Sequence, residues 1–170
     1  MKNDITIRLI EKDDYPVLEE FLYQSIFIPG GIEAPPHEII LKPEIYIYIK
    51  DFGGIDDCGV VAEYGGKIIG AAWTRIIPAY GHIDDKTPEL AISVLPKFRG
   101  QGIGGKMMAR LFKELFDRGY EKTSLSVQKD NPAVRFYKRL GYKVTGERLD
   151  SVDNEDYLMV KVLRQPQSIL

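Results

Sequence analysis

The sequence predicts a mixed α/β fold with a mostly antiparallel sheet, and three patterns predict it. The pair Gly65-Gly66 separates two β-rich runs, a second hairpin pattern occupies about 143–163, and a strand–helix–strand pattern lies between them. Two-residue turns join antiparallel strands, whereas a strand–helix–strand unit joins parallel ones. We therefore expect antiparallel pairs toward both ends of the chain and a parallel pair in the middle.

Size and charge restrict the class of protein. A length of 170 residues is typical of one compact domain, so residues 1–170 are expected to fold as a single unit. The content of 44% hydrophobic residues excludes a disordered chain, and the single cysteine excludes a disulfide scaffold. Lys and Arg number 23 against 25 Asp and Glu, so no basic surplus supports nucleic acid as the main partner.

The compartment follows from two observations. Cys58 is the one cysteine, which forbids an internal disulfide and fits a reducing environment. The opening MKNDITIRLIEKDD carries acids where a signal peptide needs an apolar core, and no window approaches the roughly 20 apolar residues of a membrane span. We expect a cytoplasmic protein without a membrane partner.

The first elements are a strand and a helix. ITIRLI at 5–10 predicts a strand, and the apolar spacing over 13–22 predicts a helix with Pro16 in its first turn. The Pro- and Gly-rich loop at 27–36 is a candidate substrate wall, because long loops in compact domains are often functional. EIYIYIK at 44–50 fits a strand by composition and a short helix by its length and leading proline, and both stay open.

The middle of the chain predicts three strands. The runs at 60–64 and 67–76 flank Gly65-Gly66, which favours a primed hairpin turn. LAISVL at 90–95 is continuously apolar, as is typical of a strand covered on both faces, and Pro96 ends it because proline cannot donate to a ladder. This strand is expected at the centre of the sheet.

The remaining elements alternate between helix and strand. Apolar residues at helical spacing over 102–118 predict one amphipathic helix, which Gly119 ends. SLSV at 124–127 predicts a strand. Asn131 is a candidate N-cap for a further helix that ends at Gly141, and the final hairpin follows.

The most informative segment joins the strand at 90–95 to the helix at 102–118 through a turn with four glycines. Unpaired backbone N–H groups and the helix dipole point there at one spot that suits a phosphate. Glycines let the main chain approach a ligand, and Lys97, Arg99 and Lys106 add positive charge. A tight turn with a basic rim is the alternative, but it would need only one glycine.

Two phosphate-binding fingerprints fit this turn only in part. The spacing G-x-G-x-x-G from Gly100 matches a dinucleotide site, but Gln128 stands where an acid should hold the ribose. The turn also approaches a P-loop, but Met107 occupies the position whose hydroxyl should bind Mg²⁺. A nicotinamide or flavin oxidoreductase therefore stays as an alternative, whereas the nucleotide-triphosphatase reading fails.

A third pattern, Arg99-x-x-Gly102-x-Gly104 followed by NPAVRFYKRLGY, resembles the GNAT superfamily of acetyl-CoA-dependent N-acetyltransferases. The resemblance spans about 5–163 in element order and is most specific over 89–142. It implies an α/β (α+β) fold with a twisted, mostly antiparallel sheet, helices on both faces and a central parallel pair splayed around the cofactor. It also implies acetyl-CoA as co-substrate and direct acetyl transfer to a primary amine in a ternary complex.

The resemblance further implies which residues hold the cofactor. Main-chain groups of the 90–95 strand would pair with the pantetheine arm, and the glycine turn would hold the pyrophosphate. Asn131 would hydrogen-bond the cofactor in addition to capping its helix. The implied cofactor-binding residues are Ile92, Ser93, Val94, Arg99, Gly100, Gln101, Gly102, Ile103, Gly104, Gly105 and Asn131.

Acetyl transfer needs a free amine lone pair and a proton for the departing thiolate. Freeing the lone pair of an amine with a pKa of about 10.4 at pH 7 costs about 4.6 kcal/mol. Glu89 is the first candidate base, because the equivalent GNAT strand often carries a catalytic Glu, and Asp84 and Asp85 are substitutes. Tyr137 is implied to lie near the sulfur, with core packing beside Phe136 as its alternative role.

The other reactive residues carry weaker signals. Cys58 lies away from the glycine turn, so we expect a structural or surface thiol, and His37 and His82 are too scattered for a metal site, so no metal is expected. The expected partner is a small-molecule or peptide amine that the sequence does not identify, and a homodimer stays open. A binding module that senses acetyl-CoA without turnover is the alternative. Glu89→Gln and Tyr137→Phe would leave its behaviour unchanged.

Overall fold

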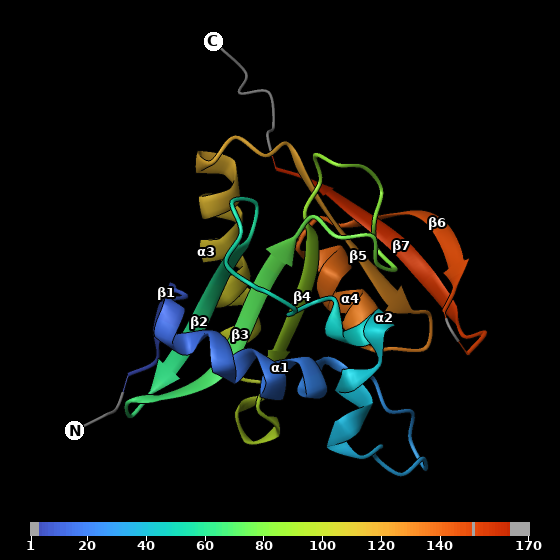
Figure 1. Cartoon of the computed structure of the whole chain (residues 1–170), viewed down its shortest axis with the longest axis horizontal. Coiled ribbons are helices and arrows are strands. Elements are labelled where there is room, and N and C mark those ends of the chain that lie inside the picture. Colours follow the sequence, from blue (N-terminus) through green and yellow to red (C-terminus); the bar gives the residue numbers. More distant parts are fainter. Residues whose placement is uncertain (1–3, 151, 164–170) are drawn as a thin grey trace.

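The structure, a computed structural model, describes residues 4–150 and 152–163, and these build a seven-stranded sheet (Figure 1). The strand order is β1-β2-β3-β4-β5-β7-β6. Neighbouring strands are antiparallel except for the central pair β4 and β5, as the sequence predicted. The strands are β1 (Thr6–Leu9), β2 (Cys58–Tyr64), β3 (Lys67–Arg75), β4 (Glu89–Val94), β5 (Lys122–Gln128), β6 (Lys143–Leu149) and β7 (Glu155–Val162).

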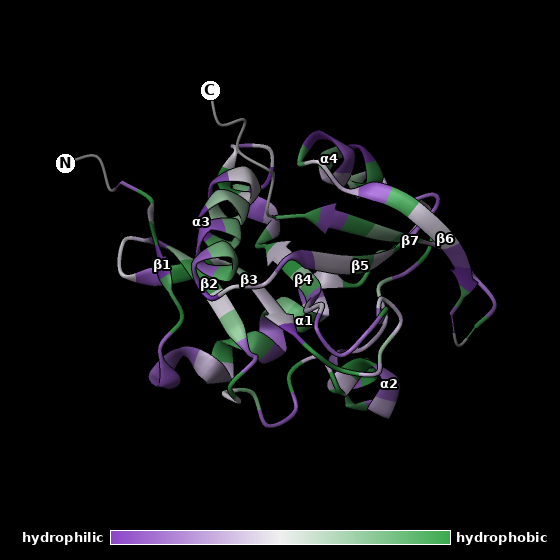
Figure 2. Ribbon diagram, turned by 90° about the horizontal axis from the view of Figure 1, so that it is seen from above, coloured by the Kyte–Doolittle hydropathy of each residue, from purple (hydrophilic) through white to green (hydrophobic). Residues whose placement is uncertain are grey.

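Helices cover both faces of the sheet. Figure 2 shows α1 and α2 on one side and α3 and α4 on the other. None of the helices described is long and apolar enough to cross a bilayer. The α-helices are α1 (Leu18–Ser25), α2 (Pro43–Tyr46), α3 (Ile103–Asp117) and α4 (Ala133–Arg139), and the 3₁₀ helices are η1 (Lys12–Val17), η2 (His37–Leu41) and η3 (Pro96–Phe98).

Two apolar cores hold the three layers together. The amphipathic face of α3 packs onto the sheet through a cluster that includes Met107, Leu111, Leu115, Leu125 and Met159. On the opposite face α1 packs against β2 and β3 through Leu18, Phe21, Leu22, Val61 and Trp73. Full burial of each such side chain contributes about 1.5–3 kcal/mol. The central strands are therefore anchored from both sides.

The backbone geometry confirms one turn, one helix end and one helix cap that the sequence predicted. Gly65 and Gly66 have φ values of 59° and 78°, which fit the primed turn expected between β2 and β3. Helix α3 ends at Asp117, and Gly119 follows with a φ of 95°, in the left-handed region that favours glycine. The side chain of Asn131 accepts a hydrogen bond from the Ala133 N–H at 2.9 Å, so it caps α4 as predicted.

The helix predicted over 13–22 is shifted. The α-helix begins only at Leu18, and Pro16 lies in the preceding 3₁₀ turn η1. Pro16 lacks an N–H, and a reciprocal capping box between Glu11 and Asp14 winds this segment tightly. The open segment at 44–50 is helical, because Pro43 occupies the first position of α2 and hydrogen-bonded turns continue to Lys50.

The sheet opens between its two parallel strands. β4 and β5 are paired at one position, Glu89 with Ser124, whereas β4 pairs with β3 over its whole length. The strands separate from that point toward Pro96, which follows β4. The separation begins well before Pro96. One edge of β4 consequently lacks a strand partner along most of its length.

Candidate active site

The glycine turn forms an open cradle at the start of α3. Gly100 and Gly102 have φ values of 75° and 80°, a conformation in which other residues are strained. A Cβ atom added at Gly100, Gly102 or Gly105 would meet no heavy atom within 4 Å, so the outer surface of the turn is free for a ligand. The first N–H groups of the helix lack intrahelical acceptors and, with the helix dipole, favour an anion here.

Two residues of the glycine turn contribute to packing within the protein. The Ile103 side chain is 1% exposed in the core, so this residue can offer a ligand only its main chain. A Cβ at Gly104 would lie 3.2 Å from Cζ of Phe136, so the missing side chain lets α4 pack closely against α3. The glycine pattern therefore combines a ligand cradle with a helix contact.

Arg99 connects the turn to its surroundings. Its Nε donates to the Val94 carbonyl at 2.8 Å, and its Nη2 donates to Oε1 of Gln24 at 3.2 Å. The exposed guanidinium thereby ties the turn to the end of β4 and to α1, and it contributes positive charge at the mouth of the groove described next.

A groove of about 660 Å³ runs from this turn along the open edge of β4. It lies between the end of α1 and the start of α4, and its size suits a small-molecule ligand. Five of the eleven implied cofactor residues line the groove, and Tyr137 lines it with them. The five are Ile92, Ser93, Val94, Arg99 and Asn131.

The open edge of β4 presents its main chain to this groove. Residues along an antiparallel strand point their N–H and C=O groups alternately to either side. Since the Leu95 N–H bonds to the Ile69 carbonyl on β3 at 2.9 Å, Ser93 also faces β3, and Ile92 and Val94 face the groove. Ser93 is further engaged through its hydroxyl, which donates to a carbonyl of α1 at 2.6 Å.

Glu89 lies at the inner end of the gap, where β4 and β5 still pair. Its side chain is 2% exposed, and its Oε2 accepts hydrogen bonds from the Tyr48 hydroxyl and from the Gly81 N–H at 3.0 Å. Its Oε1 has no protein partner in the described chain. Burial raises the pKa of Glu89 from 4.5 to about 7, although both hydrogen bonds lower it. The carboxyl is thus poised to exchange a proton near neutral pH.

The raised pKa predicts a stability cost at high pH. The folded state holds the Glu89 proton more tightly than the unfolded chain, whose pKa is 4.5, so stability falls as pH rises from 4.5 to about 7. A shift of this size corresponds to about 3 kcal/mol. We expect urea unfolding to show that wild type loses about this much relative to Glu89→Gln between about pH 5 and pH 8. Parallel pH profiles of the two proteins would contradict the shift.

Gly81 and Tyr48 are contributors that sequence reasoning missed. A Cβ at Gly81 would lie 2.8 Å from the backbone of β5 and 2.9 Å from Cδ of Glu89, so only glycine lets this loop reach the carboxylate. Tyr48 comes from the segment that was left open between strand and helix. Neither residue carries a local motif, because both contacts join parts of the chain that are distant in sequence.

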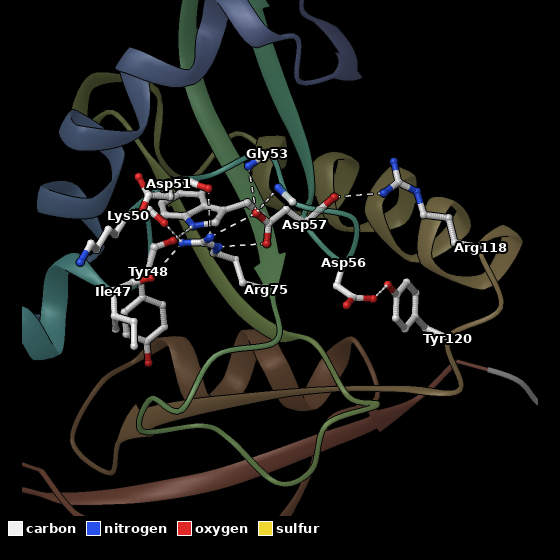
Figure 3. Close-up of polar contacts among 12 residues, drawn as sticks. Ile47, Tyr48, Lys50, Asp51, Gly53, Asp56, Asp57, Arg75, Arg118 and Tyr120 are labelled. Carbon is white, nitrogen blue, oxygen red and sulfur yellow. Dashed lines mark hydrogen bonds and ion pairs between the residues drawn. The ribbon is translucent and has the colours of Figure 1, made fainter.

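A buried arginine holds the segment that carries Tyr48 (Figure 3). Nη1 of Arg75 donates to the carbonyls of Ile47 and Lys50 at 3.0 and 2.6 Å, and its Nε bonds to Asp57 at 2.9 Å. The indole of Trp73 donates to the Tyr48 carbonyl at 2.8 Å. These bonds satisfy backbone groups that lie outside any sheet, and they orient the Tyr48 phenol toward Glu89.

A second cavity of about 210 Å³ continues from the groove into the gap between β4 and β5. Ile92, Asn131 and Tyr137 line both spaces, so the groove and the cavity meet at these residues. Tyr48 lines the inner cavity and connects it to Glu89 through its hydroxyl. A ligand in the groove and a second ligand in the cavity would therefore contact each other beside Tyr137.

Tyr137 is suited to donating a hydrogen bond at this junction. Its ring packs edge-on against Tyr142, and burial raises the pKa of the Tyr137 phenol to about 12. The phenol therefore stays protonated at neutral pH. Oδ1 of Asn131 is occupied by the helix cap, which leaves its side-chain NH₂ group for a ligand.

The substitute bases lie elsewhere. Oδ1 of Asp84 accepts the Lys86 N–H at 2.8 Å, and hydrogen bonding lowers the pKa of Asp84, so it is a turn residue on the surface. Asp85 is almost fully exposed beside His82. Of the three acids, Glu89 alone adjoins the gap between β4 and β5 in the described structure.

Cys58 and the histidines lie outside the groove and cavity. Cys58 is buried in the core, and burial raises the pKa of its thiol to about 11, which leaves it unreactive. His37 stacks on Tyr23 with ring centroids 3.8 Å apart. Within residues 4–150 and 152–163, no group of three His, Cys, Asp or Glu side chains is arranged to hold a metal ion.

The sheet thus opens between two parallel strands, with a glycine turn suited to an anion at one end and a buried carboxyl at the other. Residues 22–142 match the model of the acetyltransferase (GNAT) family, which covers most of the chain. The chain belongs to the GNAT acetyltransferase family.

Individual relatives agree with this family. The chain is 31% identical over 84 residues to mycothiol acetyltransferase from Pseudarthrobacter chlorophenolicus, a match that spans 49% of this chain and 26% of the relative. The match thus covers about a quarter of that protein's length.

Two solved structures share the fold over nearly their whole length. The ribosomal-protein-S18-alanine N-acetyltransferase from Escherichia coli has a TM-score of 0.68 at 20% identity, covering 98% of this chain and 99% of that one. A Salmonella typhimurium protein with its cofactor acetyl-CoA has a TM-score of 0.68 at 20% identity, covering 99% of both chains. At this identity the likeness shows the fold, and it confirms the predicted mixed sheet with its single parallel pair.

Proposed function

We propose that the protein is an acetyl-CoA-dependent N-acetyltransferase that transfers the acetyl group directly to a primary amine in a ternary complex. The observation that carries the proposal is the meeting of groove and cavity at Tyr137, with Glu89 at the inner end. A related fold that binds acetyl-CoA supports the choice of cofactor.

The chain offers a fitting partner for each part of this cofactor. The amides of the glycine turn suit the pyrophosphate, because the turn is open on its outer side and lies at a helix N-terminus. The main-chain groups of Ile92 suit the amide-bearing pantetheine arm, since they face the groove without a strand partner. Asn131 adds a donor near the junction. Acetyl-CoA would supply an activated acetyl group to the cavity beside Tyr137.

Glu89 acts as the base in this proposal. It reaches the cavity through the Tyr48 hydroxyl, which donates to its Oε2 and lines the cavity wall. An ammonium ion at Tyr48 can pass its proton to the phenol oxygen while the phenol passes its own proton to Glu89. A pKa of about 7 leaves a large fraction of Glu89 ionised at neutral pH and able to receive that proton.

Tyr137 stabilises the departing sulfur. Its pKa of about 12 lies above the value of about 8.5 for a thiol, so full proton transfer from the phenol to the thiolate is uphill. A hydrogen bond to the developing thiolate is favourable, and water then supplies the proton.

The burial of the Cys58 thiol supports direct transfer of the acetyl group to the amine, rather than transfer through an acylated cysteine. Cys58 is the one cysteine of the chain and is buried in the core with a pKa of about 11, so it is unsuited to carry an acyl group. A buried reduced thiol also fits the cytoplasm, where we place the enzyme. The acceptor is a small-molecule or peptide amine.

Ligand binding and turnover test this function together. We expect acetyl-CoA to raise the melting temperature of the purified protein while NAD and ATP leave it unchanged. We also expect free coenzyme A thiol to appear when a panel of primary amines is added. Stabilisation by NAD alone would overturn the cofactor assignment. Acetyl-CoA binding without thiol release across the panel would favour the sensor module.

A further inference from the structure

A second buried acid lies in the inner cavity and is not used by the proposed chemistry. Asp156 on β7 is 6% exposed, and its Oδ2 accepts a hydrogen bond from the Ser126 hydroxyl at 2.8 Å. Its Oδ1 has no partner in the described part of the chain. Burial raises the pKa of Asp156 above its usual value. Leaving a buried carboxylate oxygen unpaired is costly, which indicates that a ligand group completes this site.

The charged side chains that line the cavity are acidic. Across the described residues, two charged side chains line it, Asp156 and Asp150. Asp150 is engaged in the turn between β6 and β7, where its Oδ1 accepts the N–H groups of Val152 and Asn154, both at 2.9 Å. Asp156 accepts its hydrogen bond from the Ser126 hydroxyl instead of from backbone N–H groups. A cationic ligand group would therefore find its free acceptor at Asp156.

The nearest basic neighbour across the strands does not neutralise Asp156. Arg148 on β6 is directly opposite Asp156 in the antiparallel pair. Its guanidinium instead donates to the Tyr80 carbonyl at 2.9 Å, and no ion pair joins it to Asp156. Ser126 is the hydrogen-bond donor that Asp156 has from the described protein, and a hydroxyl carries no charge.

Asp156 lines the cavity, and the other buried acid, Glu89, is joined to the cavity wall through the Tyr48 hydroxyl. Glu89 is in register with Ser124 on β5, and Asp156 is in register with Gln128 on the same strand. Their carboxyl groups lie closer together than this register, because Asp156 bonds to the Ser126 hydroxyl and a Cβ at Gly81 would lie 2.8 Å from the Ser126 nitrogen and 2.9 Å from Cδ of Glu89. The cavity wall also includes the apolar residues Leu22, Ile26, Ile45 and Leu90. This arrangement suits a chain of methylene groups with a cation at each end.

We infer that Asp156 binds a second ammonium group of the acceptor, so that the acceptor class is a linear aliphatic diamine. The inference rests on the proposed acetyl transfer, since it identifies the substrate of that same site. One amine reacts beside Tyr48 and Tyr137, and the distal ammonium pairs with Oδ1 of Asp156. A monoamine leaves this acid unpaired, and an amino acid of equal length places a carboxylate against it.

Three acceptors of matched length test the subsite by thiol release with saturating acetyl-CoA. They are cadaverine, pentylamine and the ω-amino acid of the same chain. We expect kcat/KM for cadaverine to exceed that for pentylamine by about tenfold or more, because a charge-assisted hydrogen bond to a buried acid is lost with the monoamine. The amino acid should be the poorest acceptor. This comparison in wild type requires no variant to fold.

The variant Asp156→Asn keeps the shape of the side chain and removes its charge. We expect it to lower the cadaverine-to-pentylamine ratio to near one, mainly through KM for cadaverine. Glu155→Gln is the matched control, because Glu155 is the preceding residue on β7 but is exposed and paired with Lys129. It should retain the wild-type ratio. A ratio near one in wild type, or an unchanged ratio in Asp156→Asn, overturns the subsite.

Calorimetric titration of cadaverine into the coenzyme A complex separates this inference from the proposed function. Equal turnover of cadaverine and pentylamine would overturn the subsite and support acetyl transfer. Cadaverine binding that Asp156→Asn abolishes, without turnover of any amine, would support the subsite and overturn acetyl transfer. Wild-type protein that binds no cadaverine overturns the subsite whatever the turnover.

Discussion

Glu89→Gln is expected to lower kcat for amine acetylation by about 100- to 10,000-fold, the range typical of losing a general base. The substitution preserves the size of the side chain and a hydrogen-bonding partner for Tyr48, but it removes the proton acceptor. Because Glu89 is buried, a water molecule cannot readily replace it. The measurement is thiol release at saturating concentrations of both substrates.

The pH profile distinguishes a base from a packing residue. Since burial raises the pKa of Glu89 to about 7, the wild-type kcat should rise with pH through about 7 as the carboxyl ionises. In Glu89→Gln this rise of kcat with pH should disappear. Glu19→Gln removes an equal charge from an exposed position on α1. It should keep both the wild-type kcat and its rise with pH. A Glu89→Gln enzyme with the wild-type rate and profile would exclude Glu89 as the base.

Gly102→Asp is expected to weaken acetyl-CoA binding by about 100-fold or more. The φ of 80° at Gly102 strains any other residue, so the turn must reorganise and its amides lose their common direction. The new carboxylate would also stand where the proposed pyrophosphate binds, and like charges repel there. Calorimetric titration with acetyl-CoA measures the loss, which corresponds to about 2.7 kcal/mol.

Gly66→Asp provides a matched control for the strain. Gly66 has a φ of 78° and equally open surroundings, but it lies in the hairpin turn between β2 and β3. Both variants should lose some thermal stability for the same backbone reason. Only Gly102→Asp should lose cofactor affinity. Equal acetyl-CoA affinity in Gly102→Asp and wild type would show that the turn does not hold the pyrophosphate.

Recognition and catalysis place different demands on the two buried acids. Glu89 must change protonation state near neutral pH, and it has a hydroxyl donor that lines the cavity. Asp156 must remain available to a cation, and its free Oδ1 meets that need. The proposed site therefore uses Glu89 for proton transfer through Tyr48, and Asp156, which lines the cavity, for substrate selection.

Several features followed from the sequence because they depend on neighbouring residues. The primed turn at Gly65-Gly66 needs positive φ at both positions, and helix α3 follows from apolar spacing between Gly102 and Gly119. The Asn131 cap is equally local, since it joins residues two apart. The mixed fold, with its central parallel pair, followed from the order of such elements. The helix that starts at Leu18 was misplaced because propensity rules do not resolve 3₁₀ from α geometry beside a proline.

By itself, then, the sequence determined the order of elements, the glycine turn and the identity of Glu89 as an acid on the central strand. Tertiary structure alone decided that Glu89 is desolvated and that Tyr48 and Gly81 contact it. It also decided that Asp156 lines the same cavity as Tyr48. The physical reason is that burial and charge pairing depend on contacts between segments far apart in the chain. A carboxylate on the surface and one in the gap between β4 and β5 have the same letter in the sequence, but solvent and partners give them different chemistry.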